Sequence, residues 1–235
     1  MRLNKYLAEC GLGSRRACDK LIQEGKVRIN GKPAALGTEV LEHDSVTVSG
    51  RAVNPPSRHT YVMLHKPKGY ITSASDEKGR KTVFELVKNT NVRLFPVGRL
   101  DYDTEGLLLL TNDGELCEKL THPSHQVGKT YVAKIEGEIS EDEVKRMRAG
   151  LVIDEGEAAT KRSSVDVLEK GEGFTKLELV IYEGRNRQIR KMFEAVDKKV
   201  IFLKRTAIGE IRLGGLSRGE YRYLNERELK YLRKI

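Results

Sequence analysis

Two acidic side chains, Asp101 and Asp103, stand directly before Gly106 and four consecutive leucines, with Arg99 two residues ahead of the first acid. A charged carboxylate that is paired with a guanidinium at the edge of a water-poor cleft can act as a nucleophile or a general base. Aspartates before a strand also serve as plain turn residues, because they hydrogen-bond nearby backbone amides. The neighbouring arginine and the apolar segment that follows favour the chemical role.

A pair of carboxylates is also the catalytic set of many glycoside hydrolases. Such acids must face each other across the bond that is broken. Asp101 and Asp103 lie only two residues apart at the start of one strand, where a facing arrangement is not expected. A hydrolase that uses this pair is therefore a weak alternative.

The charge of the chain points to a polyanionic partner. The 235 residues include 43 Lys and Arg against 34 Asp and Glu, for a net charge of +9. Residues 1–32 hold eight basic and three acidic side chains, and residues 183–218 hold ten and four. A basic protein with concentrated positive segments is typical of nucleic-acid binding. The two segments predict two contact surfaces, or one surface built from both.

The second basic segment contains a helix. After Gly184 the apolar residues follow helical spacing, which predicts a helix over 189–196. At about 100° per residue, Arg190 lies about 110° from the centre of the apolar stripe and can reach along the edge of the core. Arg187 and Lys191 point away from the stripe and are expected to face RNA or solvent.

The first basic segment reads as a small helical unit. Ser14 is a suitable N-cap for a helix over 15–24, with Ala17, Leu21 and Ile22 turned inward. The turn Asn30-Gly31 predicts a hairpin directly after it. Six basic side chains gather on the exposed sides, where a merely solvated charged face is the plain alternative: Arg15, Arg16, Lys20, Lys26, Arg28 and Lys32.

The rest of the chain divides at a proline pair. The small unit is expected to span residues 1–50, and residues 51–60, which contain Pro55-Pro56, are expected to be a linker. Residues 61–235 then form a larger α+β domain. Its expected elements are strands at 61–67, 105–111, 129–137 and 174–184, and a helix from the capping box at Ser140 to Gly150.

Other classes of function find little support. Cys10, Cys18 and Cys117 are widely spaced without a CxxC pair, which predicts buried thiols. His122 and His125 flank Pro123, which predicts a turn, and the sequence offers no obvious further ligands, so no metal site is predicted. No run is long enough to span a membrane, and the first residues lack the apolar region of a signal peptide. A cytoplasmic protein without a membrane partner is expected.

The N-terminal unit resembles a known RNA-binding module. The run SRRACDKLIQEGKVRINGK at 14–32 is similar to the S4 domain, which occurs in a ribosomal protein and in several RNA-modifying enzymes. The resemblance implies that the six basic residues named above contact the RNA backbone. Such contacts position an RNA but do not read its sequence.

The rest of the chain resembles the pseudouridine synthases. GRLDYDTEGLLLLTNDG at 98–114 is similar to the signature of that family, and further similarities are K-P-x-G at 66–69, K-T-Y at 129–131 and E-G-R-N-R-Q-I-R at 183–190. More narrowly, the chain is similar to the ribosomal RNA branch, in which an S4 domain precedes the catalytic domain. The implied fold is a mostly antiparallel mixed sheet with flanking helices.

The resemblance assigns roles to individual residues. Asp101 matches the catalytic aspartate, Tyr131 a tyrosine that packs against the target base, Arg190 a basic residue that pairs with the catalytic acid, and Leu213 a pocket leucine. Asp103 matches a variable position and is expected to be structural. The implied RNA contacts of the catalytic domain are Arg99, Arg185, Arg187 and Lys191.

The implied reaction detaches uracil from the ribose at N1, rotates it and rejoins it at C5, without cofactor or metal. Asp101 could attack ribose C1′, abstract a sugar proton or attack uracil C6, and the sequence does not choose among these routes. The expected partner is ribosomal RNA or a ribosomal subunit precursor, with 23S favoured over 16S because Arg187 is not accompanied by a histidine. A monomer is expected. The alternative function is a non-catalytic RNA-binding factor of ribosome assembly, in which Asp101 is only a turn residue.

Overall fold

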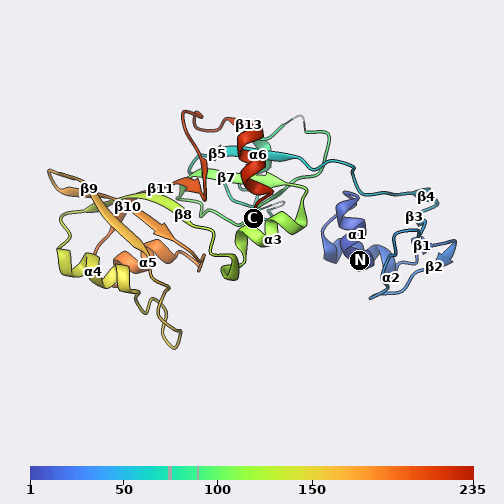
Figure 1. Cartoon of the computed structure of the whole chain (residues 1–235), viewed down its shortest axis with the longest axis horizontal. Helices are drawn as coiled ribbons and strands as arrows, with labels where there is room; N and C mark the ends of the chain where they lie inside the picture. The colour runs from blue at the N-terminus through green and yellow to red at the C-terminus, as the bar shows by residue number, and fades with distance from the viewer. Residues whose placement is uncertain (74–75, 89) are drawn as a thin grey trace. The chain divides into compact units, whose positions relative to one another are not determined.

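The computed structural model describes residues 1–73, 76–88 and 90–235. Contacts divide the chain into two compact units (Figure 1). The first contains residues 1–60 with the short segments 90–94 and 112–114, and the second contains the remainder.

The first unit packs two helices on a small antiparallel sheet. Its elements are α1 (Leu3–Glu9), α2 (Arg15–Gln23), β1 (Val27–Ile29), β2 (Lys32–Pro33), β3 (Val46–Val48) and β4 (Arg51–Ala52), with strand order β2-β1-β3-β4. Residues 51 and 52, which sequence analysis placed in the linker, therefore belong to a strand that pairs with β3.

Local sequence explains the elements of this unit. The Ser14 hydroxyl accepts a hydrogen bond from the Ala17 amide at 3.2 Å, which confirms the predicted N-cap. Asn30 and Gly31 both have positive φ, as a tight hairpin turn between twisted strands requires. The inward face of α2 differs from the prediction, because Cys18 is buried with Ile22 whereas Ala17 is exposed.

The second unit is built on a nine-stranded mixed sheet. Its main strand order is β13-β5-β7-β11-β8-β10-β9; β6 pairs with β7, and β12 pairs with β11. Among the strands in the described part of the chain, only β7 and β11 pair in parallel, so the expected mostly antiparallel sheet is confirmed. The strands are β5 (Tyr61–Lys66), β6 (Phe95–Pro96), β7 (Glu105–Thr111), β8 (Lys129–Glu136), β9 (Ser164–Gly171), β10 (Phe174–Ile181), β11 (Val200–Ile208), β12 (Ile211–Arg212) and β13 (Tyr221–Tyr223).

Helices flank this sheet, as expected. They are α3 (Gly114–Thr121), α4 (Glu141–Ala149), α5 (Gln188–Glu194) and α6 (Glu226–Leu232), with short 3-10 turns at Val83–Glu85 and Pro123–His125. In Figure 1, α4 and α5 lie along the same side of strands β8 to β10. Leucines of α3 and α6 join one apolar cluster with Leu107 and Leu109 of β7.

The strand after the two acids lies at the centre of the sheet. Every residue of β7 is buried, because β5 and β11 pair with it and apolar side chains cover both faces. Gly106 has φ +118°, and a Cβ there would lie 2.2 Å from the carbonyl oxygen of Arg205 on β11. Only glycine permits this approach, so Gly106 brings the loop with Asp101 and Asp103 next to β11.

Candidate active site

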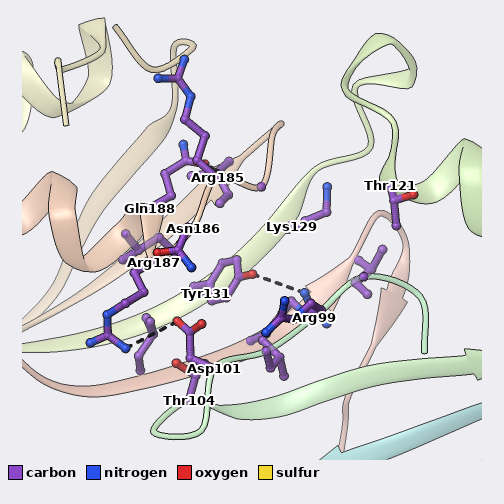
Figure 2. A pocket seen from close by; sticks show the side chains of 18 of the residues that line it. Arg99, Asp101, Thr104, Thr121, Lys129, Tyr131, Arg185, Asn186, Arg187 and Gln188 are labelled. Carbon is purple, nitrogen blue, oxygen red and sulfur yellow. Dashed lines mark hydrogen bonds and ion pairs between the residues drawn. The ribbon is translucent and has the colours of Figure 1, made fainter. Parts of the chain in front are cut away.

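A pocket of about 370 Å³ opens in the second unit where the loop before β7 meets β8, β11 and the start of α5. Its size suits a small organic group such as a nucleobase. It brings together six residues nominated from the sequence. One is Arg190, and the other five are labelled in Figure 2, namely Arg99, Asp101, Tyr131, Arg185 and Arg187.

Asp101 faces this pocket. Its carboxylate is one-third exposed (33%) and lies 3.9 Å from Nη1 of Arg187. Figure 2 shows the carboxylate between Arg187 and the ring of Tyr131. A carboxylate in this position is accessible to a ligand and lies near a guanidinium.

Asp103 takes the stronger ion pairs. Its carboxylate lies 3.3 Å from Arg187 and 3.1 Å from Nη2 of Arg190. Burial opposes the charge of Asp103, but the hydrogen bond from Arg187 and the charges of Arg190 and Arg187 outweigh it, so the pKa of Asp103 is lowered. Asp103 thus fixes the two arginines relative to the loop, in keeping with the structural role that the sequence predicted.

The expected pairing of Arg190 with Asp101 is therefore wrong in this structure. Arg190 is 8% exposed and sits on the first turn of α5, where it also donates to the carbonyl oxygens of Val200 and Asp103. These contacts hold its guanidinium at Asp103. Arg187, whose backbone is left-handed just before α5, supplies the guanidinium next to Asp101.

Two further residues that were predicted to contact RNA instead pair with groups of the protein. Arg185 donates to the carbonyl oxygens of Ala158 and Ala159 at 2.6 and 2.9 Å and ion-pairs with Glu183 and Glu157. Lys191 ion-pairs with Asp154 at 2.5 Å. Arg187 likewise faces acids, although its side chain is 42% exposed.

Tyr131 forms the wall of the pocket with a residue that sequence analysis missed. Tyr131 is 7% exposed, and its hydroxyl accepts a hydrogen bond from Nη1 of Arg205 at 3.3 Å. The guanidinium carbon of Arg205 lies 5.9 Å from the centroid of the Tyr131 ring, and its Nε donates to the carbonyl oxygen of Leu107 at 2.7 Å. Arg205 lies on the inward side of β11 together with Leu203 and Ala207, two residues before and after it. This spacing of two, typical of a strand, was the pattern from which its burial could have been predicted.

Lys66 is a second residue with an unexpected position. It is fully buried, and its Nζ donates to the carbonyl oxygens of Asp101 and Thr104 at 2.8 Å each and of Pro67 at 3.2 Å. Burial is the main cause that lowers the pKa of Lys66 to about 8, against the opposing effect of the nearby carboxylates. Through these hydrogen bonds, Lys66 holds the backbone of the loop that carries Asp101.

The remaining nominated residues lie elsewhere. Leu213 is buried in the apolar cluster of the second unit and does not line this pocket, so the expected pocket-lining role is not met. The basic residues of the first unit are exposed as expected. Of these, Lys26 ion-pairs with Glu24 at 2.7 Å and Arg28 donates to the carbonyl oxygen of Gly31. The full exposed set is Arg15, Arg16, Lys20, Lys26, Arg28 and Lys32.

Two absences hold for the described ranges 1–73, 76–88 and 90–235. Within them, no group of three or more His, Cys, Asp or Glu side chains is arranged to hold a metal ion. Within the same ranges, none of the helices is both long and apolar enough to cross a bilayer.

Comparison with known proteins defines the class to which this fold and pocket belong. Residues 60–195 match the RNA pseudouridylate synthase family, and residues 1–55 match the S4 domain. The chain belongs to the RNA pseudouridylate synthase family, in a form that carries an N-terminal S4 domain.

Relatives of known sequence extend over the whole chain. Ribosomal large subunit pseudouridine synthase B of Bacillus subtilis is 44% identical over 100% of this chain and 96% of its own length. An uncharacterised RNA pseudouridine synthase of Aquifex aeolicus is also 44% identical, over 100% of this chain and 94% of its own. A crystal structure of a pseudouridylate synthase matches with a TM-score of 0.73 and 31% identity over 99% of both chains.

Proposed function

We propose that this enzyme converts a specific uridine of ribosomal RNA, in the large subunit rather than the small, to pseudouridine. The Bacillus subtilis relative, named for the large ribosomal subunit, supports this substrate. The observation that carries the proposed mechanism is the Asp101 carboxylate inside a pocket walled by Tyr131, with Arg187 at 3.9 Å.

In the proposed mechanism the target uridine leaves its stack and enters the pocket, at a cost of a few kcal/mol. Tyr131 offers an aromatic face to the uracil, and the reacting group is the Asp101 carboxylate, 3.9 Å from Arg187. Attack at ribose C1′, removal of a sugar proton and attack at uracil C6 are the three routes open to this carboxylate. Tyr131 or a water molecule then accepts the proton that leaves C5.

Contacts to the RNA backbone offset the cost of flipping. We assign these contacts to the six exposed basic residues of the S4 domain and to Arg99 at the pocket. Arg185, Arg187 and Lys191 already pair with acids or carbonyl groups, so their contacts with RNA require an exchange of partners. Asp103 and Arg190 hold the site together in this scheme, and the protein acts as a monomer in the cytoplasm.

Mapping pseudouridines in ribosomal RNA tests the proposal. RNA from cells that lack the protein should lose pseudouridine at one position, or at a few adjacent positions, of the large-subunit RNA. Complementation with the wild-type chain should restore the modification, whereas the Asp101→Asn variant at equal abundance should not. An unchanged modification pattern in the cells that lack the protein would contradict the proposal that large-subunit ribosomal RNA is the substrate.

A further inference from the structure

The pocket is strongly cationic. Its lining contains six basic side chains and one carboxylate, that of Asp101. Four of the six are already engaged by the protein: Arg187 and Arg190 by Asp103, Arg185 by glutamates and carbonyl oxygens, and Arg205 by Leu107 and Tyr131. Arg99 and Lys129 remain, and Arg99 is exposed at the surface.

Lys129 is the partly buried cation that the protein leaves without an anionic partner. Across the described residues, no carboxylate lies within 4.0 Å of its Nζ, and the hydrogen bond that it makes, to the carbonyl oxygen of Val127, is 3.5 Å long. This distance exceeds the usual 2.7–3.2 Å of an N–H···O bond. The ammonium is therefore available for a stronger acceptor.

The position of Lys129 in the pocket suits a contact with the base of a bound uridine rather than with its sugar. Lys129 and Tyr131 are two residues apart on β8, so both project toward the same side of the strand and both line the pocket. In the view of Figure 2, the Tyr131 ring lies between Asp101 and Lys129. A uridine whose ribose C1′ is next to Asp101 and whose uracil lies on Tyr131 directs the far edge of the base toward Lys129.

The surroundings of Lys129 disfavour its charge. Burial and, after it, the positive charge of Arg205 lower the pKa of this ammonium group. Negative charge that appears nearby during a reaction would reverse this effect. Such a group is suited to stabilise an anion that forms only transiently.

We propose that Lys129 donates a hydrogen bond to a carbonyl oxygen of the flipped uracil and stabilises the uracilate anion that forms when the base is released. This inference rests on the proposed function. When the N1–C1′ bond breaks, its electron pair stays on N1, and the negative charge spreads to O2 and O4 of the ring. In one route the Asp101 carboxylate forms a bond to ribose C1′. In the other route this carboxylate removes a proton from the sugar. Bond formation from C5 to C1′ later consumes the anion, and the same step releases the Asp101 carboxylate from C1′ or returns the abstracted proton to the sugar. Loss of the C5 proton and protonation of N1 then give the neutral, aromatic base of pseudouridine. Lys129 is a catalytic residue in this scheme.

Single-turnover kinetics with the full-length protein test this role. The substrate is an RNA oligonucleotide that carries a uridine which the wild-type protein converts. Lys129→Met should lower the rate constant at saturating RNA by roughly 100-fold or more, as the loss of one preorganised donor does. The dissociation constant for the RNA and its salt dependence should stay nearly unchanged, and Lys129→Arg should retain more activity than Lys129→Met. Lys145→Met on the exposed side of α4 is the matched control and should behave like the wild type.

Thio-substituted substrates identify the contact. Replacement of O2 or O4 of the target uracil by sulfur weakens the acceptor, so one of these changes should slow the wild-type protein. The same change should have little further effect on Lys129→Met. Thermal unfolding checks that the variant is folded, and Lys129→Gln replaces it in both measurements if it is not.

Three results are distinguishable. A wild-type protein that forms pseudouridine nowhere in large-subunit ribosomal RNA, so that no such oligonucleotide is found, contradicts the proposed function itself. Product formation by Lys129→Met at the wild-type rate overturns this inference alone. A weaker affinity with a salt slope reduced by about 0.7 and an unchanged rate constant also overturns it, because that pattern shows a phosphate contact.

Discussion

The Arg190 guanidinium lies 3.1 Å from the carboxylate of Asp103 and donates to the main-chain carbonyl of the same residue at 3.2 Å. These contacts join the first turn of α5 to the loop before β7. The buried arginine is thereby committed to Asp103, and the Asp101 carboxylate two residues earlier stays free to face the pocket. The geometry thus distinguishes the two aspartates, because Asp103 is held by two arginines whereas Asp101 lines the pocket.

Replacement of Asp103 tests this separation. Asp103→Asn should lower the midpoint of thermal unfolding at neutral pH, because it loses its charged contacts with Arg187 and Arg190. We expect it to keep pseudouridine formation within roughly tenfold of the wild type, since it removes no reacting group. Thermal unfolding and product formation are measured on the same sample.

The stability loss in Asp103→Asn should depend on pH. The pKa of Asp103 is lower in the folded chain than in the unfolded chain, so its ion pairs stabilise the protein above the ordinary aspartate range near pH 4 and lose their effect as the pH falls through the folded-state value. The difference between wild type and variant should shrink toward pH 3. A difference that grows on acidification would contradict the ion-pair assignment.

Lys66 should give the protein a second pH dependence, on the alkaline side. Its pKa is about 8 in the folded chain against an ordinary value of 10.5. The unfolded chain therefore binds this proton more tightly, and the burial penalty, complete below pH 8, is relieved as the pH rises toward 10.5. The stability of the wild type relative to Lys66→Met should increase by about 1 to 3 kcal/mol over this interval.

Urea unfolding at several pH values between 7 and 10 measures this difference. The comparison of the two proteins cancels other groups that titrate in the same range. A difference that stays flat over the interval would show that Lys66 is not a buried ammonium. Lys145→Met, which removes an exposed lysine, is the control and should show no such increase.

Gly106 should tolerate no side chain. Gly106→Ala places a Cβ 2.2 Å from a carbonyl oxygen of β11 at a φ of +118°, so both backbone strain and a clash oppose folding. We expect a loss of at least about 3 kcal/mol in the free energy of unfolding. Gly114→Ala, where nothing lies within 4 Å of the added Cβ, is the matched control and should change stability by less than about 1 kcal/mol.

Salt dependence tests the role of the S4 domain. In Arg15→Ala/Arg16→Ala/Lys20→Ala, the slope of log affinity for RNA against log salt should fall by about 2 to 3, because each lost phosphate contact removes 0.7 to 0.9. The equally charged control Arg227→Ala/Lys230→Ala/Arg233→Ala alters two exposed residues of α6 and the exposed residue that caps its C-terminus, and it should keep the wild-type slope. Equal slopes in the two triple variants would argue against specific contacts by α2.

Local sequence patterns predicted the elements whose causes are local. The Ser14 cap, the Asn30-Gly31 turn and the buried strand after Asp103 all follow from residues next to one another in the chain. In the last part of the chain, short strands were expected without assigned bounds and the final helix was not predicted, although two of these elements carried usable patterns. Helix α6 begins at a capping box of Asn225 and Glu228, and β11 alternates inward and outward residues over its length.

The contacts that the pocket residues and their neighbours make could not be predicted in the same way. Lys66 and Arg205 are polar residues in strands, and their burial follows from partners that are distant in the chain, such as the carbonyl groups of Asp101 and Leu107. Helical spacing placed Arg190 correctly at the edge of the core. It could not decide between two acids that stand two residues apart, because that choice depends on how the loop and α5 meet.

Turnover by Asp101 variants tests the central claim most directly. Purified wild-type protein, Asp101→Asn and Asp103→Asn are incubated with transcribed large-subunit ribosomal RNA, and pseudouridine and RNA affinity are measured for each. The account predicts that Asp101→Asn binds RNA within about twofold of the wild type but forms no product, whereas Asp103→Asn forms it. Pseudouridine formed by Asp101→Asn at a rate near that of the wild type would contradict the account.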